Sequence, residues 1–166
     1  MAILFYWPDN VTWPNLLGGE RMSWAEHLNI NIVAVLSAAA VAWVLGAIWY
    51  TLLSKPWRAA VGVIPLESKA KGLAGHPVFP FIVSFLAEVV MALFIAALLG
   101  HLGLVTVKRG AELGFGCWAA FVATTTTVNN AYPGRKVSLT LIDAGHWLLV
   151  LIAEGVVIGV FGTFGW

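Results

Sequence analysis

The sequence predicts an all-α membrane protein, with four transmembrane helices in a bundle and an aromatic-rich, non-spanning segment before them. Of the 166 residues, 60% are hydrophobic and only 10% are charged, whereas about 25% of residues are charged in soluble domains. Four runs stay apolar over the roughly 20 residues that a spanning helix needs. None shows the two-residue alternation of a membrane β-barrel. The length fits one domain.

The segment before the helices, residues 1–29, is expected not to cross the membrane. Prolines and a glycine pair interrupt its apolar runs, and it lacks the basic start of a signal peptide. Its tryptophans suit a membrane interface; they are Trp7, Trp13 and Trp24. We therefore expect this segment to lie on the membrane surface or on a partner protein.

The transmembrane domain is predicted over residues 30–166. Its four spans are expected at about 30–53, 78–103, 111–131 and 137–161. The first span has no charged residue, and Glu88 interrupts the second. The third ends in the polar run TTTTVNNA, and a Pro-Gly turn joins it to the fourth. Such a short turn makes the third and fourth spans antiparallel neighbours.

Small residues recur at four-residue spacing in three of the spans, which lets helix backbones approach one another in lipid. The pairs are Ala42/Gly46, Gly110/Gly114, Gly116/Ala120 and Gly155/Gly159. Together they favour a compact bundle.

The basic residues indicate an orientation. Six of the nine Lys and Arg residues lie in the first and third loops, namely Lys55, Arg58, Lys69, Lys71, Arg135 and Lys136. Because cytoplasmic loops are enriched in Lys and Arg, both chain termini are expected outside the cytoplasm.

A polar stripe runs along the fourth span, in the stretch LIDAGHWLLVLIAEG. At 100° per residue, Asp143, His146 and Glu154 share one face. That face should point inward, because charge exposed to hydrocarbon costs several kcal/mol. Counting back from the turn places the polar end of the third span at the same depth. The predicted intramembrane cluster is Glu88, Thr124, Thr125, Asn129, Asp143, His146 and Glu154.

Several roles remain open for this cluster. Asp143 and His146 are either a hydrogen-bonded pair that joins helices, with Thr and Asn as partners, or a proton or ion station. His146 alone is a possible ligand for a metal, haem or chlorin. Glu88 lies near mid-bilayer with no basic neighbour in sequence, so it is expected to be protonated. It is either hydrogen-bonded to another helix or a titrating transport site with Glu154. Glu112, placed in the first turn of the third span, suits the helix dipole without further function.

Motifs of soluble enzymes are missing from the sequence. There is no P-loop, GxGxxG, HExxH or GxSxG, so the chain is expected not to be an enzyme. A net charge of +1 gives no reason to expect nucleic acid. Cys117 is the single cysteine, which excludes an internal disulfide and a cysteine-based zinc site. No metal or other cofactor is predicted.

Two blocks of sequence, Asn29 to Gly62 and Gly114 to Gly159, resemble a family of small bacterial integral membrane proteins known as domain of unknown function 1761. The matching features include the Trp49-Tyr50 pair, Lys55 with Trp57, and the polar run from Thr124 to Asn130. The resemblance covers roughly residues 29 to 161 and implies four helices in a bacterial cytoplasmic (inner) membrane. It implies no activity.

Three functions follow as hypotheses. The first is an accessory or scaffolding subunit of a larger membrane complex, favoured by the N-terminal segment and by the missing motifs. The second is a small oligomeric transporter or channel that uses Glu88, Asp143, His146 and Glu154. The third is a cofactor- or pigment-binding protein with His146 as the ligand. Membrane lipids, and either other membrane subunits or further copies of this chain, are the expected partners.

Overall fold

The computed structural model describes residues 30–62 and 75–162. The predicted N-terminal segment, residues 1–29, lies outside this part of the chain, as do Lys69 and Lys71 of the first loop. Within it every element is helical, in agreement with the predicted class. The elements are α1 (Ile32–Leu52), α2 (Ser54–Val61), α3 (Phe79–His101), α4 (Val107–Cys117), the π-helical segment η3 (Trp118–Ala123), α5 (Thr124–Ala131) and α6 (Val137–Gly162).

Three helices are long and apolar enough to cross a membrane. These are α1, α3 and α6, with 21, 23 and 26 residues, and they coincide with the first, second and fourth predicted spans. The third predicted span, 111–131, is divided among α4, η3 and α5. None of these three elements has the length of a span by itself. Three of the four predicted spans therefore meet the criteria of length and composition.

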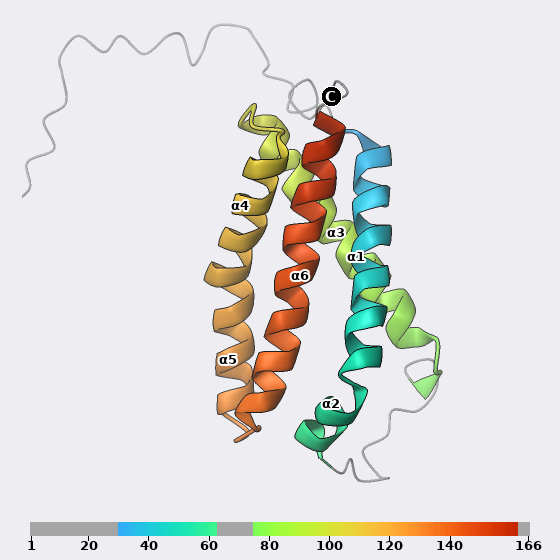
Figure 1. Cartoon of the computed structure of the whole chain (residues 1–166), viewed down its shortest axis with the longest axis vertical. Helices are drawn as coiled ribbons and strands as arrows, with labels where there is room; N and C mark the ends of the chain where they lie inside the picture. Colours follow the sequence, from blue (N-terminus) through green and yellow to red (C-terminus); the bar gives the residue numbers. More distant parts are fainter. Residues whose placement is uncertain (1–29, 63–74, 163–166) are drawn as a thin grey trace, which may run out of the picture.

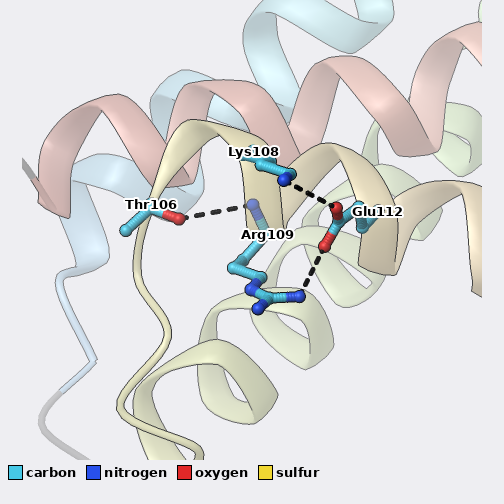
Figure 2. Close-up of polar contacts among 4 residues, drawn as sticks. All are labelled: Thr106, Lys108, Arg109 and Glu112. Atoms are coloured by element: carbon cyan, nitrogen blue, oxygen red, sulfur yellow. Dashed lines mark hydrogen bonds and ion pairs between the residues drawn. The ribbon is translucent and has the colours of Figure 1, made fainter.

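Helix α4 begins before residue 111, the predicted start of its span. Thr106 caps it, with its hydroxyl oxygen accepting from the backbone nitrogen of Arg109 at 3.3 Å. Glu112 consequently lies beyond the first turn, and its predicted role at the helix dipole is wrong. It pairs instead with Arg109 at 2.9 Å and more loosely with Lys108 at 3.9 Å, as Figure 2 shows. This exposed ion pair is a surface feature of small energetic weight.

Helix α2 was not predicted, because it is only eight residues long and contains a proline, Pro56. It follows α1 almost directly and ends at Val61, with Gly62 as its C-cap, whose φ of 79° suits glycine. The Lys136 ammonium, just before α6, donates to the Ala59 carbonyl at 2.8 Å. A cation near the last carbonyls of a helix is favourable. This contact ties α2 to the start of α6.

Helix α6 lies in the middle of the bundle and packs against α4, α1 and α3 (Figure 1). Helix α1 flanks it on one side, the α4–α5 rod flanks it on the other, and α3 crosses obliquely behind. The buried core consists mainly of small and aliphatic side chains. Its members are Val35, Ala38, Ala39, Ala92, Ile95, Ala96, Leu99, Leu151 and Ile158. Large apolar side chains also cover the outer faces, as Val90 at 65% and Phe94 at 56% exposure illustrate.

Glycines bring α4 and α6 into backbone contact. A Cβ atom added at Gly110 would overlap the Gly155 carbonyl, and one at Gly114 would overlap the Leu151 carbonyl. The predicted close packing is confirmed for these residues, whereas Gly116 has open space beside it and is exposed. Six residues at 100° each place Gly116 about 240° around the helix from Gly110, away from α6.

Candidate functional site

Asp143 is held by aromatic side chains, and this differs from the prediction. Its Oδ1 atom accepts from the Tyr50 hydroxyl at 3.0 Å and from the Trp57 indole at 3.1 Å. The Trp49 indole donates to the Ile142 carbonyl of the same turn at 3.1 Å. These donors come from α1 and α2, not from the Thr and Asn side chains of the third span. Asp143 therefore joins the α1–α2 corner to α6.

The polar end of the third predicted span has the expected depth, but most of it does not face α6. Thr124 donates to the Ala120 carbonyl at 2.8 Å and Thr125 donates to the Phe121 carbonyl, both within their own helical rod. Both threonines are exposed, as is Asn129, although Asn129 lines a shallow pocket beside Asp143. The direct side-chain bond to α6 is a different one, from Asn130 Nδ2 to Thr140 Oγ1 at 3.1 Å.

His146 lies one turn deeper in α6 and is only 6% exposed. Its ring packs against Tyr50 with 4.8 Å between the centroids, and its Nε2 atom lies next to Gly46 of α1. The Nδ1 atom is buried and has no hydrogen-bond partner among the described residues. No hydrogen bond joins His146 to Asp143 in the described residues, so the alternative of a hydrogen-bonded pair is not seen there. Asp143 uses its Oδ1 atom for the aromatic donors instead.

Two buried carboxyl groups lie in the bundle interior, one on α3 and one on α6. Glu88 of α3 is 1% exposed and Glu154 of α6 is completely buried. They are close enough to interact electrostatically. Within the part of the chain that the structure describes, the Oε2 atom of Glu88 and both carboxyl oxygens of Glu154 have no hydrogen-bond partner. The interior of this apolar bundle therefore contains a pair of acids and an imidazole with unused hydrogen-bonding capacity.

A pocket of about 450 Å³ reaches Glu88 and His146 from the outside. Residues of α1, of the first half of α3 and of α6 line it; α3 crosses behind the other two helices (Figure 1). The buried Glu88 and His146 form its inner wall, while exposed residues such as Ala47 and Thr51 lie toward its mouth. The full lining is Trp43, Gly46, Ala47, Tyr50, Thr51, Ser54, Phe81, Ser84, Glu88 and His146. The volume is within the range of small-molecule sites.

The aromatic wall of this pocket, Trp43, Tyr50 and Phe81, was not among the predicted site residues. The Trp43 indole donates to the Phe81 carbonyl and to Ser84 Oγ, both at 3.2 Å. One sequence signal could have indicated it: Phe81, Ser84 and Glu88 recur at spacings of three and four, which places them on one face of a helix. Their partners on α1 depend on the tilt of α3, which a sequence pattern does not contain.

The described side chains form no evident metal site, and His146 is the one residue predicted as a cofactor ligand. Within residues 30–62 and 75–162, no three His, Cys, Asp or Glu side chains are grouped so that they could hold a metal ion. Ligation of a haem or chlorin by His146 stays a prediction. A Cβ atom added at Gly46 would lie 2.6 Å from His146 Nε2, so α1 occupies the space beside this one nitrogen.

Comparison with known proteins gives one match. The family model described as a protein of unknown function (DUF1761) matches residues 33–159, which include every residue that lines the pocket. No curated protein matches the chain, and no solved structure does.

Proposed function

The chain belongs to the family of domain of unknown function 1761, and we propose that it is a four-span membrane protein that takes up and releases protons or another cation at Glu88 and Glu154. It is thus a small transporter or channel, with His146 beside the acidic pair. The acids come from α3 and α6, two of the three helices that are long and apolar enough to cross a membrane.

The proposed fourth span is the rod formed by α4, η3 and α5. These elements follow one another without a break over residues 107–131, about 37 Å at 1.5 Å per residue. The glycine contacts of α4 with α6 support its placement inside the same membrane layer. A π-helical turn within a rod is common at functional sites and is compatible with a span.

The proposed orientation places the α2 end of the bundle in the cytoplasm, in the inner membrane of a bacterium, with both termini outside. Among the described residues, Lys55, Arg58, Arg135 and Lys136 lie at this end, and Lys108 and Arg109 lie at the other. The excess of basic residues supports this assignment. Accessibility of single cysteines placed at Ala59 and at Lys108 to a membrane-impermeant reagent tests it, since the account predicts labelling from outside at position 108 only.

The main support for this proposal is a set of buried polar atoms that have no hydrogen-bond partner among the described residues. They are Glu88 Oε2, His146 Nδ1 and both carboxyl oxygens of Glu154. Each such atom costs about 1–3 kcal/mol relative to a hydrogen-bonded one. A purely structural cluster would be expected to satisfy its own members. Ionisable groups inside membrane segments are characteristic of ion and proton pathways. The cost is therefore best explained by an exchangeable occupant.

The predicted accessory role drew its support mainly from residues 1–29, which lie outside the described residues. It stays a prediction, as does the absence of enzymatic activity. The pocket and the acidic pair favour the transport hypothesis because they are features of the bundle interior.

Proton flux into liposomes tests the proposal. We expect vesicles containing the full chain and an internal pH dye to acidify faster than empty vesicles under an inward proton gradient with the membrane potential clamped. Glu88→Gln keeps the side-chain shape and should lower this rate at least tenfold. Glu112→Gln is the matched control, because Glu112 is an exposed glutamate paired at the surface. Equal rates in the wild type and Glu88→Gln would overturn the proposal.

A further inference from the structure

We infer that the pocket beside Glu88 binds an amphipathic organic cation, such as a hydrophobic amine or a quaternary ammonium compound. This inference rests on the proposed function, because it names the ligand class of the same site. The cation head would lie against Glu88, and its hydrocarbon part would lie between α1 and α3.

The inner wall of the pocket contains the Glu88 carboxyl group but no Lys or Arg of the described residues to pair with it. Glu88 is 1% exposed, and its Oε2 atom is without a partner. The other titratable groups that line this pocket are His146 of α6 and Tyr50 of α1, and Glu154 of α6 interacts electrostatically with Glu88. A cation is therefore the ligand that supplies the missing charge.

The side walls of the pocket are aromatic and fixed in position. The rings of Trp43 and Phe81 meet edge to face, with centroids 6.4 Å apart, and two hydrogen bonds hold the Trp43 indole. Tyr50 is held through its hydroxyl by Asp143. Rings placed around a carboxylate attract a cation through their π-faces. Because the rings are already fixed before the ligand binds, little side-chain conformational entropy is lost on binding.

An inorganic cation fits the same walls poorly. Filters for such ions replace the hydration shell with rings of oxygen atoms. Apart from Glu88, this pocket offers the hydroxyl oxygens of Tyr50, Thr51, Ser54 and Ser84 within about 450 Å³, and the Tyr50 hydroxyl already donates to Asp143. Such a volume suits a polyatomic ligand.

A second, apolar pocket of about 500 Å³ adjoins the first and indicates an amphipathic ligand. The two share Trp43 and Phe81. The other residues that line the second pocket are Val78, Ile82, Phe85 and Leu86. A hydrocarbon group attached to the cation can leave the first pocket past the shared rings and remain on an apolar surface.

Binding of radiolabelled phenyltrimethylammonium to the purified full chain in a nonionic detergent tests the inference. We expect saturable binding of one cation per chain. Glu88→Gln should weaken the affinity at least tenfold, and Phe81→Ala should weaken it about three- to tenfold. The matched controls are Glu112→Gln and Phe121→Ala, because Glu112 and Phe121 are exposed and line none of the described pockets. These two variants should bind like the wild type.

The neutral analogue tert-butylbenzene has the same shape without the charge. It should not displace the bound cation at equal concentration, whereas tetraethylammonium should. Unchanged affinity in a Glu88→Gln protein that elutes as the wild type does in gel filtration would overturn the inference. Equal displacement by tert-butylbenzene would also overturn it. Glu88→Asp retains the charge and should bind more tightly than Glu88→Gln, which separates charge from folding defects.

The two proposals fail in different ways. If proton flux depends on Glu88 but phenyltrimethylammonium does not bind, the ligand class is wrong and the proposed function stands. If the cation binds in a Glu88-dependent manner but liposomes show no flux, the ligand class stands and the transport function is wrong.

Discussion

Replacement of Gly110 by alanine tests the backbone contact between α4 and α6. An added Cβ at Gly110 would overlap the carbonyl group of Gly155, and one at Gly155 would overlap the carbonyl of Gly110. Backbone atoms cannot rotate away as a long side chain does, so the two helices must separate. Gly116, on the same helix, has nothing within 4 Å of an added Cβ. Gly116→Ala is therefore the matched control.

The magnitude follows from the required separation. Carbon and carbonyl oxygen normally approach to about 3.3–3.6 Å, so the helices must move apart by on the order of 1 Å. A gap of about 0.5–1 Å forfeits a quarter to a half of each dispersion contact across the interface. Overpacking of this kind costs about 1–3 kcal/mol, and any gain in helix propensity applies to both variants. We expect Gly110→Ala to be less stable than Gly116→Ala by about 1–3 kcal/mol.

Equilibrium unfolding in mixed micelles measures this difference, with helicity or tryptophan fluorescence followed as the fraction of denaturing detergent is raised. The account predicts a clearly earlier midpoint for Gly110→Ala and a wild-type or later midpoint for Gly116→Ala. Coincident unfolding curves for the two variants would show that α4 and α6 do not pack through Gly110, and the reasoning would be refuted.

Three further substitutions test other contacts. Asp143→Ala leaves the Tyr50 hydroxyl and the Trp57 indole without their acceptor and should lower the free energy of unfolding by about 2–3 kcal/mol. A loss below about 0.5 kcal/mol in the same titration would show that these hydrogen bonds do not stabilise the contact of α1 and α2 with α6. Trp118→Phe removes the indole donor to the Ala144 carbonyl at 2.7 Å and should cost about 1 kcal/mol, with unchanged stability as the contradicting result. Gly46→Ala would place a Cβ 2.6 Å from His146 Nε2, so the imidazole at the pocket wall must shift. The affinity for phenyltrimethylammonium should change several-fold. An identical affinity would show that His146 does not shape the site.

The long helices could be predicted from sequence because each is defined by one local property, an uninterrupted apolar run. Residues 30–53, 78–103 and 137–161 were expected, and α1, α3 and α6 follow them closely. Two features that depend on glycine could also be inferred from the sequence. One is the tight turn at Gly134, with its φ of 65°, and the other is the close approach of Gly110 to Gly155.

The contacts of the polar residues were less predictable because they depend on elements far apart in the chain. Depth along the bundle was predicted well, but the partners of Asp143 come from Tyr50 and from Trp57. Trp57 reaches Asp143 only because α2 folds back beneath the bundle (Figure 1). The shared face of Asp143, His146 and Glu154 was visible from the helical period, whereas the pocket beside Glu88 depends on the tilt of α3.

The central claim is that the Glu88 carboxyl has an exchangeable occupant, and infrared difference spectroscopy of the full chain measures this most directly. Spectra would be recorded before and after phenyltrimethylammonium is added. We expect that a carboxylic-acid C=O band is lost and a carboxylate band gained, that Glu88→Gln abolishes the change, and that Glu112→Gln leaves it intact. A difference spectrum without any carboxyl change, or one that persists in Glu88→Gln, would contradict the account.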